Sequence, residues 1–171
     1  MNASPPLLSI RRLVESDAAA FNKLRLYSLQ ESADAFGASL EDEKNKTPGQ
    51  IEGQIKNGCI YGAFAGRNII GMLCSYTSPL KKLSHKAHLY GGYVHPDHRK
   101  TGVMQQLLTA ILADLFQRHE AVMVTVVEGN NAQLDIFLAN GFVSYGIEEK
   151  AMKTNGTYSN LIRLRRDADG K

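Results

Sequence analysis

The chain has 171 residues, of which 43% are hydrophobic and 22% charged, and its formal net charge at pH 7 is +3. These values are ordinary for a globular protein, so we expect one domain spanning residues 1–171. Nucleic-acid binding on charge alone requires a basic patch or stripe, whereas the basic residues here are scattered along the chain. We therefore expect no nucleic-acid partner.

The N-terminal half predicts a strand, three helices and a hairpin, in that order. Ahead of them, Met1 to Pro6 has neither the basic start nor the apolar centre of a signal peptide. Ser16-Asp17 provides an N-cap for the first helix, and Pro48 suits the first position of the third. The expected elements cover Leu7–Val14, Ser16–Ser32, Leu40–Lys46, Pro48–Lys56, Cys59–Ala65 and Ile69–Tyr76.

The C-terminal half predicts two strand–helix units and a terminal hairpin. Gly91-Gly92 interrupts the first strand and indicates a β-bulge or the close approach of a ligand. Until that bulge, two-residue periodicity places His88, Tyr90 and Gly92 on one face. The expected elements cover His88–Val94, the helix after Gly102, Ala121–Val127, Asn131–Asn140, Phe142–Met152 and Tyr158–Arg165. Together with the first half, this order predicts one mixed α/β domain.

The cysteines and the apolar runs indicate where the protein resides. Cys59 and Cys74 lie in short apolar runs without metal-type spacing, which favours buried free thiols in a reducing compartment. No apolar run approaches the ~18 residues of a membrane span. We therefore expect a cytoplasmic protein with no membrane partner.

The segment from Val94 to Leu108 carries the most specific signal. A strand ends at Val94, Pro96 stops it, and a basic turn containing Gly102 opens directly into a long amphipathic helix. The first amides of a helix have no intrahelical partners, and the helix dipole adds positive potential there. This turn is therefore a candidate site for a phosphate or diphosphate.

Arg99-x-x-Gly102-x-Met104, after a strand ending Val-x-Pro, resembles the acetyl-CoA pyrophosphate loop of the GNAT superfamily of N-acetyltransferases. The usual pattern has Gln or Arg, two residues, Gly, one residue, then Gly or Ala, so Met104 departs at the last position. Downstream, Asn130, Phe137 and Asn140-Gly141-Phe142 resemble the family's Asn…Tyr…Gly-Phe segment. The order of strands and helices over residues 10–165 agrees with the family as well.

The resemblance implies a mixed, mostly antiparallel central sheet of six or seven strands, flanked by about four helices, with splayed parallel strands in the middle. It also implies an acyltransferase that moves an acetyl group from acetyl-CoA directly to a primary amine of a small molecule, peptide or protein. No metal is implied, and a homodimer is a candidate assembly because the family often pairs. The acceptor itself is not named by the resemblance.

The same resemblance assigns the cofactor-binding positions. Backbone groups near Gly92 would bind the pantetheine arm, the loop from Lys100 to Gln105 would cradle the diphosphate, and Asn130 would bond the pantetheine side. The full set is Gly92, Tyr93, Val94, Arg99, Lys100, Thr101, Gly102, Val103, Met104, Gln105, Asn130 and Phe137.

The family's usual acid and base are missing. The helix position that often carries a Tyr acid is Phe137, which cannot donate a proton, and the fifth-strand Glu of some relatives is Thr125. Another base position, eleven residues before Arg99, falls on His88, whose unperturbed pKa near ~6.5 suits proton transfer. The alternative for His88 is a strand histidine without a chemical role. Tyr145 and Tyr90 are the candidate acids, and water relays remain open.

Beyond the donor site, the sequence also bears on metal binding, on the acceptor and on rival functions. His85-x-x-His88 and His95-x-x-His98 do not converge on one ion if they lie on strands, so we expect no metal. A cationic acceptor would find possible anchors in the acidic residues near the second helix and the terminal hairpin, namely Glu41, Asp42, Glu43, Glu148 and Glu149. The rival functions are a catalytically idle CoA-binding module and a transferase of longer acyl groups, with Met104 and Phe137 lining its pocket.

Overall fold

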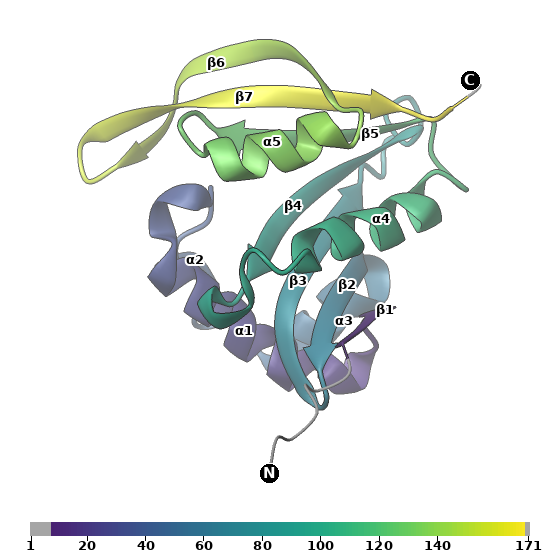
Figure 1. Ribbon diagram of the computed structural model, residues 1–171. Coiled ribbons are helices and arrows are strands. Elements are labelled where there is room, and N and C mark those ends of the chain that lie inside the picture. The colour runs from purple at the N-terminus through teal and green to yellow at the C-terminus, as the bar shows by residue number, and fades with distance from the viewer. Residues whose placement is uncertain (1–7, 170–171) are drawn as a thin grey trace.

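Seven strands form one mixed sheet in the computed structural model, which describes residues 8–169 (Figure 1). The strand order is β1-β2-β3-β4-β5-β7-β6; β4 and β5 run parallel, and every other neighbouring pair is antiparallel. This confirms the expected mixed sheet with parallel strands in its middle. The strands are β1 (Leu8–Arg12), β2 (Cys59–Ala65), β3 (Asn68–Thr77), β4 (Lys86–Val94), β5 (Ala121–Val127), β6 (Val143–Thr154) and β7 (Thr157–Asp167). Met1 to Pro6, where we expect no signal peptide, lies outside the described residues.

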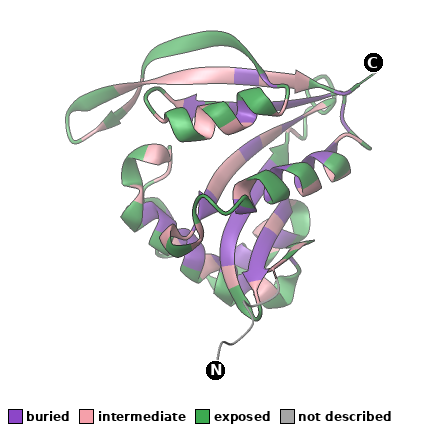
Figure 2. Ribbon diagram, viewed as in Figure 1, coloured by how far each residue is buried: buried purple, intermediate pink, exposed green. Residues whose placement is uncertain are grey.

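Helices cover the two faces of the sheet unequally. They are α1 (Ala18–Glu31), α2 (Leu40–Glu43), α3 (Pro48–Asn57), α4 (Val103–Leu115) and α5 (Asn131–Ala139). One buried cluster joins α1 and α3 to β2, β3 and β4, and a second joins α4 and α5 to the opposite face. Side chains of β3 alternate between the clusters, since Met72 faces the first and Leu73 the second. The buried core therefore lies around β2–β5, while β6 is an exposed edge strand (Figure 2).

No helix between residues 8 and 169 is long and apolar enough to cross a membrane.

Local capping explains where two helices begin. Thr47 accepts a hydrogen bond from the amide of Gln50, and its own amide donates to the Gln50 side chain, so α3 begins at Pro48 as predicted. The N-cap predicted at Ser16-Asp17 is confirmed in position, since α1 begins at Ala18 directly after Asp17, but the Asp17 side chain does not cap the helix. Asp17 instead pairs with both terminal nitrogens of Arg11 and accepts from the amide of Val14, which holds Glu15–Asp17 as a 3₁₀ turn before the helix.

The predicted bulge at Gly91-Gly92 is confirmed. Tyr90 pairs with Cys74 of β3 and Tyr93 with Met72, so two β4 glycines lie opposite one β3 residue, and Gly91 has a φ of 63°. The bulge reverses the expected facing of Gly92. A Cβ on Gly91 would point toward α1, within 3.5 Å of Arg25 Nη1, whereas one on Gly92 would point toward α4, 3.5 Å from Met104 Cε.

The parallel strands separate just beyond their first residues. β4 and β5 pair only from Lys86↔Ala121 to His88↔Met123. Beyond His88, the bulge carries β4 away from β5, as Figure 1 shows. This divergence is the feature of the fold that creates the site.

Both cysteines are free and buried, as expected from their apolar surroundings. Burial raises the pKa of the Cys59 thiol to about 11 and that of Cys74 to about 12. Neither thiol is therefore a nucleophile at neutral pH, because thiolate is the reactive form.

Candidate active site

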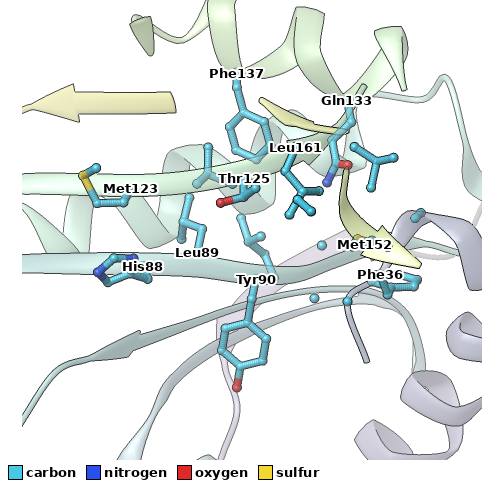
Figure 3. Close-up of a pocket in the computed structure, with 18 of the residues that line it drawn as sticks. Phe36, His88, Leu89, Tyr90, Met123, Thr125, Gln133, Phe137, Met152 and Leu161 are labelled. Atoms are coloured by element: carbon cyan, nitrogen blue, oxygen red, sulfur yellow. The ribbon is translucent and has the colours of Figure 1, made fainter. Parts of the chain in front are cut away.

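A cavity of about 440 Å³ fills the space where β4 and β5 diverge. His88 and Leu89 of β4 face Met123 and Thr125 of β5 across it, while Phe137 and Gln133 of α5 close one side (Figure 3). Phe36, from the loop after α1, and Met152 of β6 lie toward its other end. The cavity therefore joins the sheet, the loop after α1 and the terminal hairpin.

The β4 edge along this cavity offers unpaired backbone groups. Residues 89–94 have no partner on β5, because the parallel pairing ends at His88. The side chains of Tyr93 and Val94 are buried, and the Val94 carbonyl accepts a hydrogen bond from Arg99 Nε. An extended ligand that carries amide groups can pair with such an edge as an added strand would. The pantetheine contacts predicted at Gly92, Tyr93 and Val94 would fall on this part of β4, and of these three residues Gly92 lines the cavity.

Met104, the departure from the family pattern, packs toward the bulge. Its Cε lies 3.5 Å from the position that a Cβ on Gly92 would occupy. Because the strand residue has no side chain, the long methionine fits at the start of α4. Met104 thus packs beside Gly92, which lines the cavity.

The turn before α4 presents its amides outward. Lys100 and Gly102 adopt left-handed conformations, with φ of 61° and 80°, and the first helical bond runs from the amide of Gln106 to the Gly102 carbonyl. The amides of Val103 and Met104 therefore have no intrahelical acceptor. Lys100 forms no ion pair within residues 8–169. The turn has the free amides and the cation that a diphosphate requires.

Three other residues of the predicted loop are held by the protein itself. The Thr101 hydroxyl donates to the carbonyl of His98. Gln105 exchanges two hydrogen bonds with Asn140, of 2.7 and 2.8 Å, which ties α4 to the end of α5. Arg99 turns away from the loop and pairs with Glu31, the last residue of α1, at 2.7 Å. These side chains shape the loop rather than extend from it.

Asn130 caps α5 with its side chain. Its Oδ1 accepts from the amide of Gln133, and its Nδ2 donates to Gln133 Oε1 at 3.1 Å. Gln133 is thereby oriented with its Nε2 3.6 Å from the position that a Cβ on Gly92 would occupy (Figure 3). Sequence reasoning missed Gln133; the available signal was its place three residues after an Asn N-cap.

Phe137 serves the core and the cavity together. It is 2% exposed, packs edge-to-face on Phe142 at 5.2 Å between ring centroids, and also lines the cavity. A phenyl ring at this position supplies apolar wall and no proton.

His88 is the last β4 residue paired with β5, so it sits where the two strands begin to separate. Its ring stacks on Tyr76 with centroids 5.0 Å apart and lines the cavity. Burial lowers the pKa of His88, and the charges of Lys86 and Arg163 lower it further. The imidazole is therefore neutral at pH 7 and able to accept a proton.

The two tyrosines predicted as acids are placed differently from His88. The Tyr90 ring points away from the cavity, and its hydroxyl accepts from Gln54 of α3 at 3.0 Å (Figure 3). Burial also raises the pKa of Tyr90. Tyr145 is 57% exposed on β6 and is not part of the cavity wall. Of the three candidate catalytic residues, His88 and Tyr90 line the cavity, and only the hydroxyl of Tyr90 is bonded to a residue outside the cavity wall.

Residues 25–142 match the model of the acetyltransferase (GNAT) family. The chain belongs to this family. Members of the GNAT family are acetyltransferases, so the protein is an acyltransferase. No curated protein sequence matches the chain.

Solved GNAT structures share the fold at low sequence identity. A GNAT acetyltransferase from Streptococcus pneumoniae is 19% identical with a TM-score of 0.87, over 95% of this chain and 100% of that one. The putative acetyltransferase yncA from Salmonella typhimurium, solved with acetyl-CoA, is 15% identical with a TM-score of 0.83, over 96% and 95%. A ribosomal-protein-alanine N-acetyltransferase from Brucella melitensis is 17% identical with a TM-score of 0.79, over 94% and 99%. These likenesses establish the GNAT fold.

In this GNAT protein, three of the acidic residues predicted as acceptor anchors are already paired, among them Glu41 with Lys44 at 2.6 Å. Glu43 is buried and bonds the guanidinium of Arg25 at 2.7 Å, and Glu148 pairs with Arg163. Asp42 bonds the Ser39 amide and hydroxyl as part of the α2 cap. No group of three or more His, Cys, Asp or Glu side chains in the described part of the chain could hold a metal ion.

Proposed function

We propose that the chain is a cytoplasmic, single-domain N-acetyltransferase that uses acetyl-CoA and acetylates a primary amine of a small molecule, peptide or protein. The observation that carries this proposal is the gap between β4 and β5. It ends at a neutral histidine, His88, and the bulge leads from it toward the free amides at the start of α4. A donor held along the gap would present its acyl end to His88.

The residues present fit acetyl-CoA, which would supply the acetyl group as a thioester. The amides of Val103 and Met104, with Lys100 beside them, would bind the diphosphate. The unpaired edge of residues 89–94 would bond the amides of the pantetheine arm, and Gln133 would donate from the opposite side. Apolar walls at Leu89 and Phe137 would exclude water around the thioester.

Neutral His88 would accept the proton that the amine loses as its nitrogen attacks the carbonyl carbon. The new C–N bond would move the carbonyl electron pair onto oxygen, the C–S bond would break as the carbonyl re-forms, and the departing thiolate would take a proton from water. A backbone amide of the bulged strand would stabilise the oxyanion, an effect worth ~2.7–4 kcal/mol for one preorganised donor. Holding both reactants in the cavity would contribute most of the remaining acceleration.

The test is an amine and peptide panel with acetyl-CoA, in which released CoA thiol is measured and the acceptor mass is checked for one added acetyl group. Thiol release that depends on an acceptor supports the proposal. Binding of acetyl-CoA without thiol release from any acceptor would identify an idle CoA-binding module. Faster turnover with succinyl-CoA than with acetyl-CoA would identify a transferase of longer acyl groups.

A further inference from the structure

The Arg99 side chain forms a closed hydrogen-bonded cluster with α1. Its two terminal nitrogens bond the Glu31 carboxylate at 2.7 and 3.2 Å, and its Nε donates to the Val94 carbonyl at 3.0 Å. The Tyr93 hydroxyl donates to the same carboxylate at 2.9 Å. We call Glu31, Tyr93, Val94 and Arg99 the Glu31 clamp.

The clamp lies between the two halves of the site. Arg99 immediately precedes Lys100, which begins the diphosphate loop, and Tyr93 and Val94 end the β4 edge. On the other side, Glu31 ends α1, five residues before Phe36 on the cavity wall. One carboxylate therefore joins the donor loop to the segment that borders the acceptor.

The electrostatics of the clamp favour its persistence. Hydrogen bonds from Arg99, Ser32 and Tyr93 lower the pKa of Glu31 to about 2, so the carboxylate is ionised at every pH at which the enzyme would work. A bidentate arginine–carboxylate pair of this kind is stronger than a hydrogen bond between neutral groups, and it fixes the relative orientation of the two side chains. Three of the five N–H groups of Arg99 are used inside the protein.

We propose that Glu31 is a positioning residue that holds the diphosphate loop in its binding shape and couples it to the acceptor-side segment. Arg99 then acts as the loop's anchor, while Lys100 and the helix amides contact the diphosphate. The proposal rests on the proposed function for its effect on acetyl-CoA, but the clamp's effect on the loop is independent of any ligand.

The chain offers a matched control at the other end of α1. Asp17 and Arg11 form the same two-bond pair, at 2.7 and 2.8 Å, remote from the cavity wall. Glu31→Gln and Asp17→Asn each remove one ionised carboxylate from such a pair. The two variants are compared with the parent for acetyl-CoA affinity by calorimetry, and for amide hydrogen exchange of residues 95–105 without ligand.

We expect Glu31→Gln to weaken acetyl-CoA binding about tenfold, the scale of one lost charge-assisted hydrogen bond, and to speed exchange in the loop. Asp17→Asn should change neither. In a double-mutant cycle, Glu31→Gln should cost little in a protein that already carries Arg99→Gln.

Two results would overturn the clamp. One is loop exchange in Glu31→Gln that equals that of Asp17→Asn. The other is tighter acetyl-CoA binding by Glu31→Gln, which would mean that Glu31 competes with the diphosphate for Arg99. If the parent protein binds no acetyl-CoA, the proposed function fails, and loop exchange still decides the clamp.

Discussion

Gly102 offers a clean test of the diphosphate loop, because its replacement by alanine changes conformation and nothing else. Its φ is 80°, and a Cβ built on it would meet no atom within 4 Å. A left-handed conformation costs a residue with a Cβ roughly 1–2 kcal/mol. In the folded state, the effect of Gly102→Ala is therefore this strain.

The strain must appear in one of two measurements. If the loop keeps its shape, the free energy of unfolding falls by about 1–2 kcal/mol. If the loop relaxes instead, the helix amides turn away, and the same energy weakens acetyl-CoA binding by roughly 5–30-fold. Chemical denaturation measures the loss of stability, and calorimetric titration measures the loss of acetyl-CoA affinity.

Gly53 is the matched control. It lies in α3 with an ordinary helical φ, and a Cβ there also meets nothing within 4 Å. Gly53→Ala should gain up to about 1 kcal/mol of stability and leave acetyl-CoA affinity unchanged. If Gly102→Ala also left both stability and affinity unchanged, the loop would not be the diphosphate site in this conformation.

The remaining predictions concern the base, the pantetheine contact and the buried ion pair. His88→Gln should lower the acetylation rate by about 10²–10⁴-fold. Because the pKa of His88 lies below its usual 6.5, the rate of the parent protein should persist at neutral pH and fall as the pH drops through that lowered pKa. The His88→Gln variant should lack this fall at acid pH in a profile of kcat/KM against pH. A profile equal to that of the parent would exclude His88 as the base. Gln133→Ala should raise KM for acetyl-CoA several-fold with kcat retained, and steady-state kinetics with an unaltered KM would remove Gln133 from the donor site. Glu43→Gln leaves the charge of Arg25 buried without its partner and should lower the free energy of unfolding by about 3–5 kcal/mol. Glu41→Gln breaks an exposed pair and should lower it by no more than about 1 kcal/mol. Equal losses in chemical denaturation would contradict the role assigned to burial.

Local patterns predicted most elements of the fold. β5 was identified from its β-branched run and α3 from its Thr-Pro start, because both signals act within one element. The N-cap of α1 was placed correctly, but Asp17 does not cap the helix with its side chain because Arg11, a residue of the preceding strand, holds its carboxylate. Propensity alone does not reveal such competition between elements.

The site was predictable only where its geometry is local. The turn around Gly102 is encoded within a few residues, and the structure shows it at the start of α4. The facing of Gly92 depends on which β4 residue is the extra one in the bulge, and periodicity does not specify that. The partner of Arg99 lies 68 residues away on α1, so sequence spacing gave no signal for the clamp.

Amide hydrogen exchange with and without acetyl-CoA tests the central claim most directly, because it locates the donor on the chain. We expect protection in two segments together, the β4 edge at residues 89–94 and the loop at residues 100–105. Residues 143–149 of β6, which are exposed and do not line the cavity, should exchange as before. Binding of acetyl-CoA with no protection in either segment would mean that the donor does not bind between β4 and the start of α4.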